Sequence, residues 1–267
     1  MKKELAIIIP VHKYNDEIKQ YLNKALNSIK KQIYLDEIII NIVCPSNIKS
    51  EIQELITPDF YFNVLINYSD KIDYQSQVNM AIMTCETEYF TVLEFDDELS
   101  KTFLKNVNQY IEAYPDIDVF LSLMIEKNSK DEGIKFTNET VWSQQFVGEN
   151  GEIGILNSDS LKQYTDFKLS GAIIKREKFL EVGGYKSNIL LTFMYEFLLR
   201  SLNNSLKIMT IPKIIYSHLA TREDSLFNQY AKNMPILERK FWFEIATKEY
   251  NFKNDRVIDL SDLKNIK

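Results

Sequence analysis

Apolar runs and helical repeats alternate along the first half of the chain. Nearly continuous apolar runs, centred near Ile8, Ile40, Val64, Val92 and Val119, predict five buried strands. Between them, apolar residues at helical spacing predict helices over 17–32, 74–85 and 100–114. Strands that alternate with helices of this length favour an α/β fold with a Rossmann-like, mainly parallel sheet. In such sheets, ligands bind beyond the carboxyl ends of the strands.

The pattern is less regular after residue 125. We expect irregular β structure over 134–157 around Trp142, a strand over 168–175, an apolar helix over 191–203, and a strand over 206–215 interrupted at Pro212. Residues 222–249 are predicted to be largely helical, with a break near Pro235. We therefore divide the chain into residues 1–125, a second half over 126–225 of the same domain, and a C-terminal helical extension over 226–267.

Four acidic residues cluster where the fourth predicted strand ends. The segment reads Leu93-Glu94-Phe95-Asp96-Asp97-Glu98 and directly follows an apolar run. On an extended backbone Glu94 and Asp96 point the same way, and Asp97 is free to turn toward the same space. Gathered carboxylates repel one another unless a cation lies between them, and a hard divalent ion together with a diphosphate fits such a site. The alternative is an ordinary acidic loop that begins the next helix.

Composition excludes several classes of function. All seven glycines follow residue 130, so the first half has no glycine-rich phosphate loop of the Walker or dinucleotide-binding type. The net charge of -6 gives no global attraction to nucleic acid or to an anionic membrane. Cys44 and Cys85 lie in apolar segments without metal-ligand spacing, as expected of reduced core residues. No apolar stretch approaches the length of a membrane span, so we expect a cytoplasmic protein.

Four blocks of the sequence resemble family 2 glycosyltransferases of the GT-A fold. The first is Ile7-Ile8-Ile9-Pro10-Val11-His12 with the helix after it, and the second is residues 77–82 with Glu88-Tyr89-Phe90. The third is the acid cluster, which lies where the family has its DxD motif. The fourth comprises residues 169–172, 183–185, 196–200 and 217–218. The resemblance covers roughly residues 4–225 and implies inverting, metal-dependent transfer of a sugar from a nucleotide-sugar to an acceptor hydroxyl. It also implies that residues 1–125 are the nucleotide-sugar-binding half and residues 126–225 the acceptor-side half.

The resemblance also implies roles for individual residues. A divalent ion, Mn²⁺ or Mg²⁺, would be held by Asp96, Asp97 and a late histidine, His218, although a lone histidine after a strand is also typical of packed residues. A fixed cation would stabilise the charge that grows on the departing diphosphate. The donor, a UDP-sugar in the first place, would contact Pro10, Val11, His12, Tyr14, Ser46, Asp70, Gln77, Asn79, Glu94, Phe95 and Asp96.

Three positions depart from the family pattern. Cys44-Pro45-Ser46 replaces the acidic stretch that contacts the nucleotide base, and Glu94 replaces the first Asp of the DxD motif. Phe193-Met194 replaces the acidic pair that supplies the catalytic base. Glu196 is the nearest substitute for that base, but it could equally pair with Arg200, four residues further along the helix.

The sequence leaves two acceptor classes and a competing function open. A glycan is the ordinary acceptor for this family, and a hydroxymethylated DNA base is an alternative if the chain comes from a phage. A DNA acceptor needs an aromatic pocket, such as one around Trp142, and a local basic surface, for which the candidates are Lys30, Lys31, Lys175, Arg176 and Lys178. The competing function is a catalytically inactive relative that binds a nucleotide-sugar or a glycan.

Overall fold

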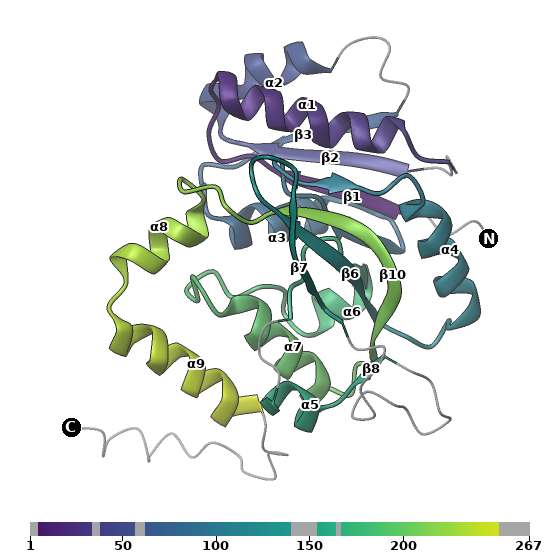
Figure 1. The fold of residues 1–267 in the computed structure, drawn as a ribbon, viewed down its shortest axis with the longest axis vertical. Helices are drawn as coiled ribbons and strands as arrows, with labels where there is room; N and C mark the ends of the chain where they lie inside the picture. The colour runs from purple at the N-terminus through teal and green to yellow at the C-terminus, as the bar shows by residue number, and fades with distance from the viewer. Residues whose placement is uncertain (1–4, 34–37, 57–61, 140–153, 164–166, 251–267) are drawn as a thin grey trace.

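The computed structural model describes residues 5–33, 38–56, 62–139, 154–163 and 167–250 (Figure 1). Its described strands form one sheet in the order β3-β2-β1-β4-β9-β6-β10-β5, with β7 paired to β6 and β8 to β10. The strands are β1 Leu5–Pro10, β2 Ile38–Cys44, β3 Asn63–Tyr68, β4 Tyr89–Val92, β5 Glu98–Leu99, β6 Val119–Lys127, β7 Gly133–Thr137, β8 Ile155–Leu156, β9 Ile173–Lys175 and β10 Ile208–Leu219. The helices are α1 Asp16–Lys30, α2 Lys49–Leu55, α3 Tyr74–Thr84, α4 Phe103–Ala113, α5 Ser158–Gln163, α6 Arg176–Glu181, α7 Phe193–Asn203, α8 Leu226–Asn233 and α9 Ile236–Tyr250.

The first half of the sheet is parallel, as the apolar runs predict. β1 pairs in parallel with β2 on one side and with β4 on the other, so Ile7 lies between Ile40 and Thr91. β2 in turn pairs in parallel with β3. The five predicted strands correspond to β1, β2, β3, β4 and β6, and the predicted α/β fold class is confirmed.

A short antiparallel strand joins the two halves of the sheet. β9 lies between β4 and β6 and runs antiparallel to both, so β4 and β6 do not pair with each other. The strand predicted over 168–175 is therefore reduced to its last three residues. The residues before it form a turn, in which Gly171 has a φ of +68° and the amide of Ala172 donates to the carbonyl of Leu169.

Helices cover both faces of the sheet (Figure 1). Buried side chains of α1, α2 and α4, such as Leu22, form one apolar core with one face of the sheet. Side chains of α3, α6 and α7, such as Phe197, form a second core with the other face. Full burial of a side chain of this kind contributes about 1.5–3 kcal/mol. Cys44 and Cys85 are buried free thiols, as predicted.

The C-terminal part of the chain crosses the sheet and then continues as two helices. β10 runs parallel to β6, with register shifts between Ile211 and Ile214 and between Ile214 and Tyr216. The interruption predicted at Pro212 is therefore a bulge within a longer strand. The helical segment predicted over 222–249 corresponds to α8 and α9, which begin only at Leu226 and have the predicted break near Pro235. In the parts of the chain that the structure describes, no helix is long and apolar enough to cross a membrane.

Candidate functional site

A cavity opens at the carboxyl end of the sheet, next to the acid cluster. It has a volume of about 400 Å³ and is lined by residues from the ends of β1, β4, β6 and β10 and from α3, α7 and α8. This volume lies within the range of small-molecule binding sites. The acid cluster does not begin a helix, because its last residue, Glu98, is the first residue of β5 and α4 starts only at Phe103. The alternative of a helix-initiating acidic loop is therefore wrong.

The backbone of the acid cluster is a turn and not a continuation of β4. β4 ends at Val92, and the amide of Asp97 donates to the carbonyl of Glu94 over 3.0 Å. The alternation argument for Glu94 and Asp96 therefore assumed the wrong backbone, because side chains alternate only along a strand. Both residues line the cavity. Ligand atoms of Glu94, however, lie within 4.8 Å of those of Asp97 and His218.

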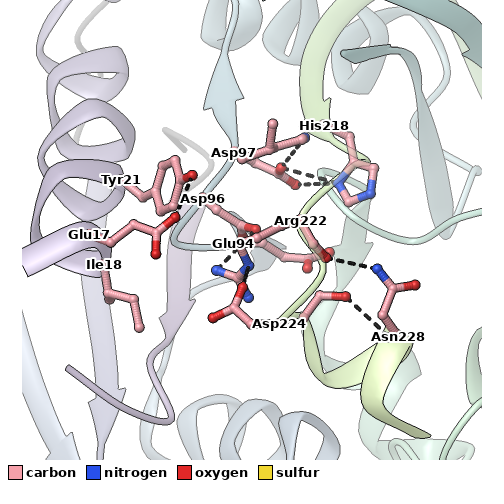
Figure 2. A network of polar contacts seen from close by, with 12 residues as sticks. Glu17, Ile18, Tyr21, Glu94, Asp96, Asp97, His218, Arg222, Asp224 and Asn228 are labelled. Atoms are coloured by element: carbon pink, nitrogen blue, oxygen red, sulfur yellow. Dashed lines mark hydrogen bonds and ion pairs between the residues drawn. The ribbon is translucent and has the colours of Figure 1, made fainter. Parts of the chain in front are cut away.

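Asp97 is buried and holds the end of β10. Its carboxylate accepts hydrogen bonds from the Tyr216 hydroxyl at 2.7 Å and from the Leu219 amide at 2.8 Å. His218 Nδ1 lies 3.0 Å from Asp97 Oδ2 (Figure 2). Burial lowers the pKa of His218, but the charge and the hydrogen bond of Asp97 outweigh burial and raise that pKa to about 9. Because Nδ1 is directed to Asp97, Nε2 is the ring nitrogen left to bind a ligand.

Two other carboxylates of the cluster, Glu94 and Asp96, are poorly solvated. Burial raises the pKa of Asp96 to about 7, and the charges of Asp97 and Glu94 add to this effect. Burial and Asp97 also raise the pKa of Glu94, whose Oε1 accepts a hydrogen bond from the Ser170 hydroxyl. A cation bound between such groups would stabilise their ionised forms. The cluster therefore has the charge and the oxygen ligands that a hard divalent ion prefers.

Arg222 lines the cavity beside the acid cluster. Its guanidinium carbon lies 4.6 Å from the centre of the Phe95 ring, and Nη1 lies 3.3 Å from Asp96 Oδ2. Nε lies 3.0 Å from Asp224 Oδ1, yet neither Nε nor Nη1 has a hydrogen bond of good geometry to a described residue (Figure 2). A buried cation with unsatisfied donors beside a cavity fits an anionic ligand. The sequence analysis missed Arg222, which lies in an irregular segment after β10 where neither periodicity nor a motif could indicate it.

A third cavity-lining carboxylate, Glu126, lies on β6, where it is the register partner of His218 on β10. Glu126 Oε1 accepts hydrogen bonds from Thr137 Oγ1 at 2.6 Å and from Lys168 Nζ at 2.9 Å. Burial acts to raise the pKa of Glu126, but these two bonds outweigh burial and hold that pKa below its ordinary value. Glu126 is therefore ionised at neutral pH. The sequence analysis also missed this residue, whose only signal was an acid at the end of a buried strand.

The predicted donor-binding residues divide into two groups. Those that line the cavity are Pro10, His12, Gln77, Glu94, Phe95 and Asp96, whereas Val11, Tyr14, Ser46, Asp70 and Asn79 do not line it. Asn79 instead fixes a backbone segment, because its Nδ2 donates to the carbonyl of Tyr185 at 2.7 Å and its Oδ1 accepts from the Tyr185 amide at 2.9 Å. Ser46 and Asp70 are exposed, just beyond the ends of β2 and β3.

Glu196 lies in the ion pair that the sequence left open as an alternative. Its side chain is only 1% exposed, and Oε1 and Oε2 accept hydrogen bonds from Arg200 Nε at 2.7 Å and Nη2 at 3.0 Å. Glu196 is not among the residues that line the cavity, whereas Met194, two positions earlier, is. A role for Glu196 as catalytic base stays a prediction, and these contacts weigh against it.

The sequence matches glycosyl transferase family 2 over residues 6–178, which is more than half of the chain. The chain therefore belongs to this family. A comparison with curated protein sequences finds no match.

Comparison with solved structures supports the GT-A fold. Residues 1–349 of TarS from S. aureus, in complex with UDP-GlcNAc, are similar to this chain with a TM-score of 0.62 and 16% identity. The match covers 84% of this chain and 60% of that one, so the chain spans about three fifths of the TarS fragment. The mannosyltransferase PcManGT from Pyrobaculum calidifontis, in complex with GDP-Man and Mn²⁺, is similar with a TM-score of 0.61 and 13% identity, over 94% of this chain and 72% of that one. At these identities the likeness shows the fold alone.

Proposed function

We propose that this chain transfers a sugar from a nucleotide-sugar to an acceptor hydroxyl, with inversion at the transferred carbon and with a bound divalent cation. The proposal is carried by the position of Glu94, Asp96 and Asp97 at the carboxyl end of the central strand β4, beside a cavity of about 400 Å³. It is supported by membership of glycosyl transferase family 2. Two proteins of similar fold are known in complex with UDP-GlcNAc and with GDP-Man and Mn²⁺.

The side chains of the acid cluster fit Mn²⁺ or Mg²⁺. Glu94, Asp97 and His218 offer two carboxylates and an imidazole nitrogen within 4.8 Å of one another, and Asp96 adds a third carboxylate whose charge Arg222 offsets. A cation bound here would neutralise the charge of the departing nucleoside diphosphate. Asp97 would also orient the imidazole, because His218 Nδ1 is directed to its carboxylate.

Other residues of the cavity would bind the donor. Arg222 has two donor groups without good hydrogen bonds, and these would be satisfied by phosphate oxygens of a diphosphate. His12 and Gln77 line the cavity near the end of β1. Burial, together with the charges of Lys13 and Arg222, lowers the pKa of His12 to about 4, so its ring is neutral at pH 7. A neutral imidazole can donate or accept a hydrogen bond, which suits an uncharged nucleotide base such as uracil.

A glycan acceptor is favoured over modified DNA. Of the basic residues that a DNA acceptor would need, Lys175 is paired with Asp118 and Lys178 with Glu181. Arg176 donates its Nε–H to the carbonyl of Ile82 at 2.9 Å. The two ion pairs offset the positive charge of Lys175 and Lys178, which phosphate binding requires. Trp142 lies outside the described residues.

The proposal is tested by measuring release of nucleoside diphosphate from a panel of UDP- and GDP-sugars, with and without glycan acceptors. We expect release that depends on Mn²⁺ or Mg²⁺ and stops on addition of EDTA. Asp96→Asn should lower the rate of nucleoside diphosphate release at least about 100-fold, because a carboxylate beside the proposed site of the cation and the diphosphate is lost. Asp116→Asn is the matched control, since Asp116 is an exposed acid that pairs with Lys207 away from the cavity.

Two other outcomes would change the conclusion. If calorimetry detects binding of a nucleotide-sugar but no acceptor supports turnover, the chain is a binding protein related to glycosyltransferases. If release is the same in EDTA and in Asp96→Asn, the acid cluster is not the site of a catalytic cation.

A further inference from the structure

The cavity offers three carboxylates among the residues that the structure describes. Two of them, Glu94 and Asp96, belong to the acid cluster at the diphosphate end. The third is Glu126, which comes from a different strand and is not part of that cluster. An inverting transfer needs a base that takes the proton of the acceptor hydroxyl, on the side of the sugar opposite the diphosphate. Such a base has to be a residue other than those that hold the cation, and Glu126, although it is the register partner of His218, is not one of them.

The contacts of Glu126 fix one carboxylate oxygen and leave the other available. Thr137 Oγ1 at 2.6 Å and Lys168 Nζ at 2.9 Å both donate to Oε1, and Lys135 Nζ lies 3.6 Å from the same atom. Oε2 has no hydrogen bond from any residue in the described ranges. The side chain is 6% exposed and lines the cavity. Glu126 is therefore held in place with one acceptor atom free for a substrate proton.

Glu126 lines the same cavity as the position at which the family has its acidic pair. Met194 stands at that position here and lines the same cavity. The amide of Leu169 contacts Met194 Sδ at 3.4 Å, and the neighbouring residue, Lys168, donates to Glu126. The adjacent residues Lys168 and Leu169 thus contact Glu126 and Met194, respectively. A carboxylate on β6 can therefore act in the cavity in place of one at position 194.

We infer that Glu126 is the base that activates the acceptor, in place of the acidic pair that Phe193-Met194 cannot provide; this rests on the proposed function. As the acceptor oxygen forms its bond to the anomeric carbon, its proton passes to Glu126. The bond from the anomeric carbon to the phosphate oxygen breaks, and the nucleoside diphosphate leaves with the electron pair. The proton is then released from Glu126 to solvent. Glu94 is less suited to the role, since it accepts a hydrogen bond from the Ser170 hydroxyl and its ligand atom lies within 4.8 Å of those of Asp97 and His218.

The test compares Glu126→Gln with Thr137→Val in the full chain. Glutamine keeps the size of the side chain but cannot accept the proton, so we expect kcat for transfer to fall at least about 100-fold. The affinity for the donor with Mn²⁺, measured by calorimetry, should stay within threefold of the wild type. Thr137→Val removes a hydrogen bond to the same carboxylate but leaves the base, and kcat should fall less than tenfold. Thermal unfolding of both variants shows whether either change disrupts the fold.

The outcomes separate the inference from the proposed function. If the wild type shows no cation-dependent transfer, the proposed function fails and the inference fails with it. If the wild type is active and Glu126→Gln retains kcat within tenfold, or loses no more than Thr137→Val, Glu126 has a structural role only. Should Glu126→Gln not fold, Glu126→Asp keeps the charge beside Lys168 but withdraws the carboxylate by one methylene. We then expect kcat to fall at least tenfold with unchanged donor affinity, and an unchanged kcat would overturn the inference.

Discussion

Replacing Glu196 by glutamine removes one charge from a buried ion pair while keeping the shape of the side chain. The carboxylate binds Arg200 through two hydrogen bonds, of 2.7 and 3.0 Å, and Lys186 Nζ lies 3.3 Å from Oε1. Arg200 also donates to the carbonyls of Val182 and Gly184, so the pair holds the turn before Tyr185. The glutamine would leave the guanidinium buried without a counter-charge.

The expected loss of stability follows from these contacts. Removing one partner of a buried ion pair costs about 3–5 kcal/mol. The glutamine carbonyl can still accept one hydrogen bond from Arg200, and a bond to a charged group contributes about 1.5 kcal/mol. The free energy of unfolding should therefore fall by about 1.5–3.5 kcal/mol. For a chain of this length, that corresponds to a decrease in Tm of about 3–14 °C.

Urea unfolding and kcat, measured on the same variant, decide between the two roles of Glu196. Glu181→Gln is the matched control, because Glu181 forms an exposed pair with Lys178 and its loss should leave the free energy of unfolding nearly unchanged. We expect Glu196→Gln to keep kcat within tenfold of the wild type. A loss of less than 1 kcal/mol together with a kcat at least 100-fold lower would refute this reasoning and identify Glu196 as the base.

Two further predictions concern the packing beneath the site and its response to acid. Gly171→Ala should lower stability by about 2–5 kcal/mol, because the new Cβ would lie 2.2 Å from Tyr216 Cδ2 on a backbone with positive φ; a normal urea midpoint would contradict this. Folding lowers the pKa of His12 from near 6.5 in the unfolded chain to about 4. The contribution of His12 to folding stability is therefore complete above pH 6.5 and is lost as the pH falls toward 4. Between pH 7 and pH 4, the free energy of unfolding of His12→Gln should therefore fall by up to about 3 kcal/mol less than that of the wild type. Equal decreases in the two proteins would show that His12 does not titrate in this way.

The fold of the first half could be predicted from the sequence because its strands are long, continuous apolar runs. Residues such as Ile8 and Ile40 are buried on both sides of the sheet, and this leaves a strong signal. The insertion of β9 between β4 and β6 left no such signal. Its three residues follow a turn that depends on Gly171, and strand order is set by tertiary packing rather than by local pattern.

The site could be predicted in composition but not in geometry. Glu94, Asp96 and Asp97 were identified as a cluster, yet the sequence could not show that they form a turn that directs Asp97 to His218 and places Asp96 beside Arg222. Arg222 and Glu126 were missed for a common reason. Each becomes part of the site only when distant segments meet at the cavity, and neither belongs to a local motif.

The bulges of β10 set how many residues separate them from His218, and the site depends on that number. Tyr216 and His218 both reach Asp97, because side chains two residues apart along a strand lie on the same face. The register shifts between Ile211 and Tyr216 determine which pair is presented to Asp97. Insertion or deletion of a single residue in this stretch would turn Tyr216 and His218 to the other face of the strand and remove both side-chain partners of Asp97 at once. The number of residues between the bulge and His218 is therefore a requirement of the site in its own right, separate from the identity of any side chain there.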